Sequence, residues 1–139
     1  MTVSRHPQDF EAVSRDILMS TPCLVEMPAG TGKTQLLATM ASILSAAGCR
    51  TLILTHTNAG VAAIESRLRR LGLPLHETTI ATVASWAERV TTAYPDSSGI
   101  DRSIVRGVEN YFDGRVQGAC QLASTDWFAE MIATSYQAV

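Results

Sequence analysis

The stretch Pro28-Ala29-Gly30-Thr31-Gly32-Lys33-Thr34, here called the glycine loop, decides how the rest of the chain is interpreted. It follows a short apolar run at residues 23–27 and precedes a stripe of apolar residues at helical spacing that begins at Leu36. Glycines in such a turn adopt positive φ and approach a ligand without a Cβ clash. Successive N–H groups then point into one concavity at the positive end of a helix dipole. The sequence therefore predicts a phosphate-binding loop.

Each position of the glycine loop has an expected role. Lys33 is expected to reach the β- and γ-phosphates of a nucleotide, and the Thr34 hydroxyl to coordinate Mg²⁺, which makes both candidate catalytic residues. The nucleotide-cradling residues are expected to be Pro28, Ala29, Gly30, Thr31, Gly32, Lys33 and Thr34. ATP and Mg²⁺ are the expected cofactors. Met27 stands where this motif usually has its first glycine, and the alternative is a chance Gly/Thr-rich turn.

Predicted strands alternate with predicted helices through the first two thirds of the chain. Short strands are expected at residues 23–27, 50–55 and 78–80, and helices after the glycine loop and from Asn58 onward. Alternation of this kind implies right-handed crossovers and a parallel sheet with flanking helices, that is, an α/β fold class. We expect residues 1–94 to form a nucleotide-binding α/β segment.

The final third of the chain has a different pattern. Residues 95–103 are predicted to be a loop, because Pro, Asp, Ser and Gly follow one another closely. Helices are predicted near 104–112, ended by Gly114, and from 116 to about 136. Residues 95–139 are therefore expected to form a mostly helical subdomain.

Composition limits the partners of the chain. Hydrophobic residues make up 46% of it and charged residues 17%, which excludes compositional disorder. The net charge of −2 requires any nucleic-acid contact to be local. We expect a cytoplasmic protein without membrane contact, since no apolar run has the length of a membrane span and the three cysteines lie far apart.

Polar side chains follow the second and third predicted strands, at Thr57-Asn58 and at Thr82 to Ser85. Because the carboxyl ends of parallel strands face the ligand side of a sheet, these groups are candidates for contacting a phosphodiester backbone. Two alternatives remain open: Thr57 or Asn58 caps the next helix, and Trp86 is a core residue beside incidental hydroxyls.

The glycine loop, Thr-His-Thr-Asn-Ala-Gly-Val-Ala-Ala-Ile at 55–64 and Thr-Val-Ala-Ser-Trp-Ala at 82–87 resemble three ordered motifs of UvrD/Rep-type superfamily-one DNA helicases. The resemblance covers about residues 22–94. Its second motif is the most specific, because family members commonly have Thr-x-Thr-Asn followed by small residues. In the third motif Ala84 replaces a histidine that is common in the family.

This resemblance implies a RecA-like P-loop NTPase fold, ATP bound at the glycine loop, and a single-stranded DNA track. Thr57, Asn58, Thr82 and Ser85 are the implied DNA-contacting residues, and Trp86 is a candidate for stacking on a base. Gln8 is the implied adenine-reading residue. The alternative is that Gln8 is a solvated glutamine at the start of a helix. The full enzyme would be an ATP-hydrolysing helicase.

Two elements of ATP hydrolysis are missing from the sequence, namely an apolar strand ending in Asp-Glu and an assignable arginine finger. The expectation is an amino-terminal segment of a longer enzyme that hydrolyses ATP poorly alone and self-associates through an unpaired sheet edge. One alternative is a small P-loop kinase or nucleotide-dependent switch. Another is a non-catalytic domain that binds a nucleotide or a protein.

Overall fold

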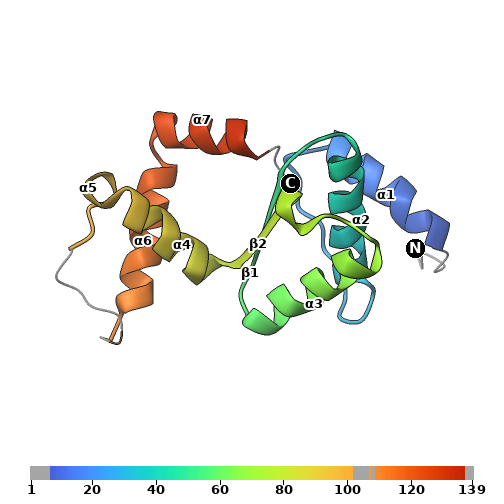
Figure 1. The fold of residues 1–139 in the computed structure, drawn as a ribbon, viewed down its shortest axis with the longest axis horizontal. Helices are drawn as coiled ribbons and strands as arrows, with labels where there is room; N and C mark the ends of the chain where they lie inside the picture. The colour runs from blue at the N-terminus through green and yellow to red at the C-terminus, as the bar shows by residue number, and fades with distance from the viewer. Residues whose placement is uncertain (1–6, 102–106, 108, 137–139) are drawn as a thin grey trace.

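The computed structural model describes the backbone of residues 7–101, 107 and 109–136, without the side chains of residues 7–9 and 75. Of the helix expected near 104–112, residues 104–106 and 108 lie outside the described residues, whereas 107, 109 and 110 are turn residues and Tyr111 and Phe112 begin α6. Figure 1 shows α1, α2 and α3 around two strands at one end of the molecule and α4 to α7 at the other. The elements in chain order are α1 (Pro7–Met19), α2 (Lys33–Ala46), β1 (Thr51–Thr55), α3 (Asn58–Arg70), the 3₁₀ turn η1 (Leu75–Glu77), β2 (Thr78–Thr82), α4 (Val83–Ala93), α5 (Pro95–Ser98), α6 (Tyr111–Ala123) and α7 (Asp126–Ser135).

Within the described residues, the sheet consists of β1 and β2, which pair in parallel with Thr51 opposite Thr78 and Thr55 opposite Thr82. Parallel neighbours require a crossover connection, and α3 supplies it. The α/β class with a parallel sheet, flanking helices and a helical final third is confirmed. The RecA-like P-loop NTPase fold stays a prediction.

The core of the α/β part lies where α2 and α3 pack against β1. Its buried members are Ala38, Ala41, Ile53, Ile64 and Leu68. Leu68 has no exposed surface, and Ile53 points from the middle of β1 into the same cluster. Burial of these apolar side chains fixes the crossover helix on the strand pair, and thereby fixes where both strands end.

The strand predicted at residues 23–27 is wrong. This segment has no regular secondary structure, and the side chains of Leu24 and Val25 are 87% and 44% exposed. Apolar residues make a strand only when a neighbour completes the hydrogen-bond ladder and covers the side chains. Among the described residues β1 pairs with β2 alone, so the segment gains neither.

The helical end differs from its prediction in three places. The expected loop at 95–103 begins with α5, a single turn that Pro95 starts at a position favourable to proline. Gly114 does not end a helix, because its N–H donates to the Asn110 carbonyl oxygen at 3.0 Å and α6 continues. The long helix expected from 116 is divided between α6 and α7, since Thr125 has extended backbone angles.

Polar and aromatic contacts join α4 to α6 and α7. The Tyr111 hydroxyl donates to Glu88 Oε1 at 2.7 Å, and Arg115 donates to Thr91 Oγ1 at 3.1 Å. Because α4 follows β2 directly, these contacts connect the helical end to the sheet. The division at residue 94 stays a prediction. In the part of the chain that is described, no helix is long and apolar enough to cross a membrane.

Candidate nucleotide and nucleic-acid site

The backbone of the glycine loop turns through two glycines in the left-handed region, Gly30 with φ 74° and Gly32 with φ 97°. Gly32 is the N-cap of α2, so the helix begins at Lys33. No side chain caps this end, and the first turn of α2 carries no acidic residue. The N–H groups and the positive dipole end are thus open to an external anion, which is the arrangement that binds phosphate in proteins.

Lys33 lies back over the glycine loop. Its Nζ donates to the carbonyl oxygens of Met27 and Pro28, the latter at 3.0 Å. The Thr31 hydroxyl donates to the same Pro28 oxygen at 2.7 Å, which closes the loop on itself. Two carbonyl oxygens therefore hold an exposed ammonium group above the loop, where it can exchange them for phosphate oxygens.

The other loop residues fit a phosphate cradle to different degrees. A Cβ built at Gly30 meets nothing within 4 Å, so the loop is open there, whereas one at Gly32 meets the ring of Phe10. Thr34 is half-buried in the first turn of α2, and Pro28 and Ala29 are exposed. Gln8 belongs to α1, but its side chain lies outside the described residues, so its role as an adenine-reading residue stays a prediction.

A groove of about 660 Å³ borders the glycine loop between α1, residues 21–27 and α2. Ile17, Val25, Leu36 and Met40 are among its apolar lining residues, and Lys33 is the one charged residue in its lining. An apolar groove does not bind phosphate groups, so the phosphate contacts are assigned to the loop and to the start of α2.

The residues predicted to contact DNA meet at one edge of the sheet, here called the strand-end edge. The pairing of Thr55 with Thr82 places Thr57 and Asn58 beside the start of α4, where Ser85 lies. In Figure 1 the first turn of α3 and the glycine loop both lie at the lower side of the α/β part. The start of α3 and the glycine loop that precedes α2 thus lie on the same side of the α/β part.

The threonines of the strand-end edge also cap their helices. Thr57 Oγ1 accepts a hydrogen bond from the Gly60 N–H at 3.0 Å. Thr82 and Ser85 form a reciprocal capping box, in which each side chain accepts from the other's backbone N–H. Thr57, Asn58 and Ser85 are exposed, whereas Thr82 is buried. The capping alternative is therefore confirmed, and the DNA contacts stay predictions.

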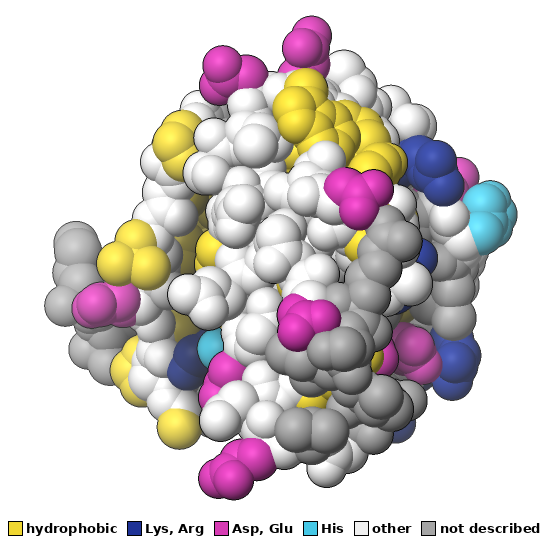
Figure 2. Space-filling view, turned by 90° about the vertical axis from the view of Figure 1, so that its left-hand side faces the viewer, with side chains coloured by type: hydrophobic (Ala, Val, Ile, Leu, Met, Phe, Trp, Pro, Cys, Tyr) yellow, Lys and Arg dark blue, Asp and Glu magenta, His cyan; other side chains and the backbone are white. Residues whose placement is uncertain are grey.

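Trp86 is half-buried and packs edge to face on Phe128, with ring centroids 6.4 Å apart. The packing alternative describes this side chain, and base stacking by Trp86 stays a prediction. Figure 2, which looks onto the helical end, shows acidic side chains spread over that face and Lys and Arg mostly at its right-hand margin. Among the described residues, this face shows no continuous basic surface of the kind that binds nucleic acids.

Comparison with known families identifies the chain. A model of the UvrD/REP helicase N-terminal domain matches residues 6–135. The chain belongs to this family. Neither a search of curated proteins nor one of solved structures found a match.

Membership of the UvrD/REP family supports a helicase-family function, with DNA as partner and with the ATP and Mg²⁺ that such helicases generally use. Sequence reasoning missed two residues of the site region in this family member. Phe10 contacts Gly32, and Gly60 contacts Thr55. A glycine in the first turn of an amphipathic helix was the available signal for Gly60. No sequence signal connects Phe10 to a residue 22 positions away.

Gly60→Ala is expected to destabilise the chain by about 1–3 kcal/mol, although alanine is the better helix former. The new Cβ would lie 2.5 Å from Thr55 Oγ1, 3.2 Å from Thr57 Oγ1 and 3.3 Å from Thr55 Cγ2, so two threonine side chains would have to move. Gly114→Ala in α6 is the matched control, because its Cβ meets nothing within 4 Å. Urea denaturation should show Gly114→Ala to be stabilised by up to about 1 kcal/mol. Equal stability of the two variants would contradict the contact.

Proposed function

We propose that the chain is the nucleotide-binding segment of an ATP-dependent DNA helicase that acts on single-stranded DNA. The glycine loop binds ATP with Mg²⁺, and the strand-end edge follows the DNA backbone. The observation that supports this best is the start of α2: a left-handed glycine without a side-chain cap, next to a lysine folded over the loop. That combination offers fixed N–H donors and one mobile cation to a phosphate chain.

Different residues of the glycine loop have different roles in the proposed nucleotide binding. N–H groups from Gly30 to Thr34 donate to the phosphate oxygens. Lys33 exchanges the Met27 and Pro28 carbonyl oxygens for the β- and γ-phosphates. Thr34 would hold Mg²⁺, which would offset the negative charge of the phosphates. The described residues include no cluster of three or more His, Cys, Asp or Glu side chains that could hold a metal.

The strand-end edge binds single-stranded DNA through its exposed groups. Asn58 and Ser85 donate to phosphate oxygens, and the dipoles of α3 and α4 favour the same negative charge. Thr57 and Thr82 keep these two helix starts in place through their caps. α2, α3 and β1 share one buried core, so a shift of α2 on nucleotide binding would reach the DNA contacts through packed side chains.

Hydrolysis by this chain alone is expected to be slow, because the sequence has no apolar strand that ends in Asp-Glu. The proposal keeps residues 1–94 as the nucleotide-binding segment and 95–139 as a helical subdomain. Self-association through the free edge of β1, where Leu54 is 40% exposed, also stays a prediction.

Binding of fluorescein-labelled oligo(dT) tests the proposed binding of single-stranded DNA. The wild-type chain is expected to bind it in a salt-dependent way, and Asn58→Ala to weaken binding about tenfold, because a hydrogen bond to a charged phosphate is lost. Gln117→Ala, which removes an exposed amide from α6, is the matched control and should change affinity by less than about twofold. Equal affinity of the two variants, or no binding by the wild type, would contradict the proposed DNA binding.

A further inference from the structure

The ring of Phe10 touches the glycine loop from α1. A Cβ built at Gly32 would lie 2.8 Å from Phe10 Cζ and 3.3 Å from Phe10 Cε1, and both atoms belong to the aromatic ring. Phe10 is half-buried, and it lies 22 positions before Gly32 in the sequence. The contact therefore joins the start of α1 to Gly32, the N-cap residue of α2.

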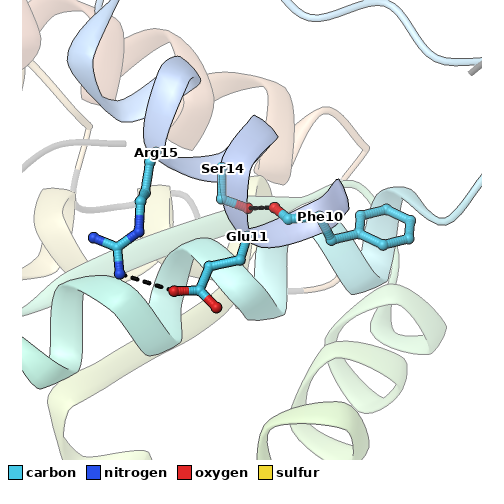
Figure 3. Close-up of polar contacts among 4 residues, drawn as sticks. All are labelled: Phe10, Glu11, Ser14 and Arg15. Carbon is cyan, nitrogen blue, oxygen red and sulfur yellow. Dashed lines mark hydrogen bonds and ion pairs between the residues drawn. The ribbon is translucent and has the colours of Figure 1, made fainter. Parts of the chain in front are cut away.

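The turn of α1 that carries Phe10 is itself held in place. The Ser14 hydroxyl has no exposed surface and donates to the Phe10 carbonyl oxygen at 2.6 Å. Figure 3 shows the Phe10 ring projecting from α1 on a different side from the exposed ion pair of Glu11 and Arg15. The ring is thus directed toward the loop and away from the Glu11–Arg15 ion pair.

The backbone of Gly32 determines how two parts of the proposed phosphate site are oriented. Its φ of 97° turns the chain into α2, and its carbonyl oxygen accepts the first helical hydrogen bond, from Leu36 N–H at 2.9 Å. Its neighbour Lys33 carries the cation that lies over the loop. A change of backbone angle at Gly32 therefore reorients both the N–H donors and the lysine.

We propose that Phe10 is a positioning residue for the glycine loop: its ring bears on Gly32 and holds the loop in the conformation that binds the phosphate chain. The inference rests on the proposed nucleotide binding and makes α1 part of that site, although Phe10 contacts no phosphate. Side chains that fix the groups around a ligand raise affinity because the bound geometry exists beforehand.

Titration of ATP and of inorganic tripolyphosphate into the full chain tests the proposal. Phe10→Ala is expected to weaken both ligands about tenfold, and Phe10→Leu, which keeps an apolar side chain over Gly32, about threefold. Ile17→Ala is the matched control, because Ile17 is also a half-buried residue of α1 but lines the groove beside α2. It is expected to lower thermal stability while changing affinity by less than about twofold.

A size-exchange cycle gives the second measurement. Gly32→Ala places a methyl group against the ring, and the backbone strain at φ 97° is present whether or not the ring is there. The loss of affinity caused by Gly32→Ala should therefore be smaller in the Phe10→Ala background. If Phe10→Ala does not fold, Phe10→Leu takes its place in the cycle.

The outcomes separate this inference from the proposed function. No binding of either ligand by the wild type overturns both. Wild-type binding with unchanged affinity in the Phe10 variants, or strictly additive effects in the cycle, overturns the positioning role alone. A loss for ATP without a loss for tripolyphosphate would also overturn it, since that pattern marks a contact with the base or the sugar.

Discussion

Lys33→Ala is expected to abolish ATP binding while leaving the chain folded. The substitution removes the one cation that lies over the glycine loop among the described residues, and charge-assisted bonds to phosphate are the strongest contacts available there. We expect a loss of at least about 100-fold in affinity. The side chain is exposed and outside the core, so its removal costs little stability. Titration with a fluorescent ATP analogue, beside far-ultraviolet circular dichroism, measures both quantities.

A control variant and a chemical-labelling experiment test the same assignment of Lys33. Arg70→Ala removes an exposed cation from the last turn of α3 and should leave ATP affinity unchanged. Lys33 is the only lysine in the sequence, so an amine-selective reagent has two targets, this side chain and the amino terminus. Bound ATP should protect Lys33 but not the terminus, as peptide mass spectrometry would show. Equal affinity of Lys33→Ala and wild type, or labelling that ATP does not change, would refute the assignment of the glycine loop.

The turn of the glycine loop was predictable because its determinants are local. Gly30 and Gly32 supply positive φ, and Lys33 starts a helix whose apolar stripe can be counted in the sequence. The common edge at which the segments after β1 and β2 begin was predictable for a different reason. Parallel strands end at the same edge of a sheet, so residues that directly follow two such strands are predicted to lie at that edge.

Features that depend on a distant partner were not predictable. The apolar run at 23–27 has strand composition, but whether it pairs is decided by neighbours that its own residues do not specify. The contact of Phe10 with Gly32 depends on how α1 docks, which the helical spacing of α1 leaves open. In the helical end, α6 continues through Gly114 and ends before Thr125, and the apolar spacing of residues 104–136 did not specify either feature.

Phe128→Ala is expected to lower the free energy of unfolding by about 3–5 kcal/mol. Phe128 is 1% exposed and lies against three aromatic rings, those of Trp86, Tyr94 and Trp127, at centroid distances of 6.4, 6.0 and 5.6 Å. Its removal would leave a cavity between α4 and α7. The expected loss is a large share of the roughly 5–15 kcal/mol that stabilises a typical domain. Urea denaturation followed by tryptophan fluorescence measures it.

Trp127→Ala is the matched control for Phe128→Ala. It removes a larger ring from the adjacent position of α7, but that ring is 44% exposed, so we expect a loss of only about 1–2 kcal/mol. Similar losses for the two variants would contradict the buried position of Phe128. The shape of the unfolding transition also tests the predicted division at residue 94. Phe128 lies after this division and contacts Trp86, which lies before it, close to the strand-end edge. A loss confined to one of two unfolding steps would favour separate 1–94 and 95–139 units. One cooperative step shifted as a whole would favour a single unit, in which packing at α7 stabilises the start of α4 where Ser85 faces solvent.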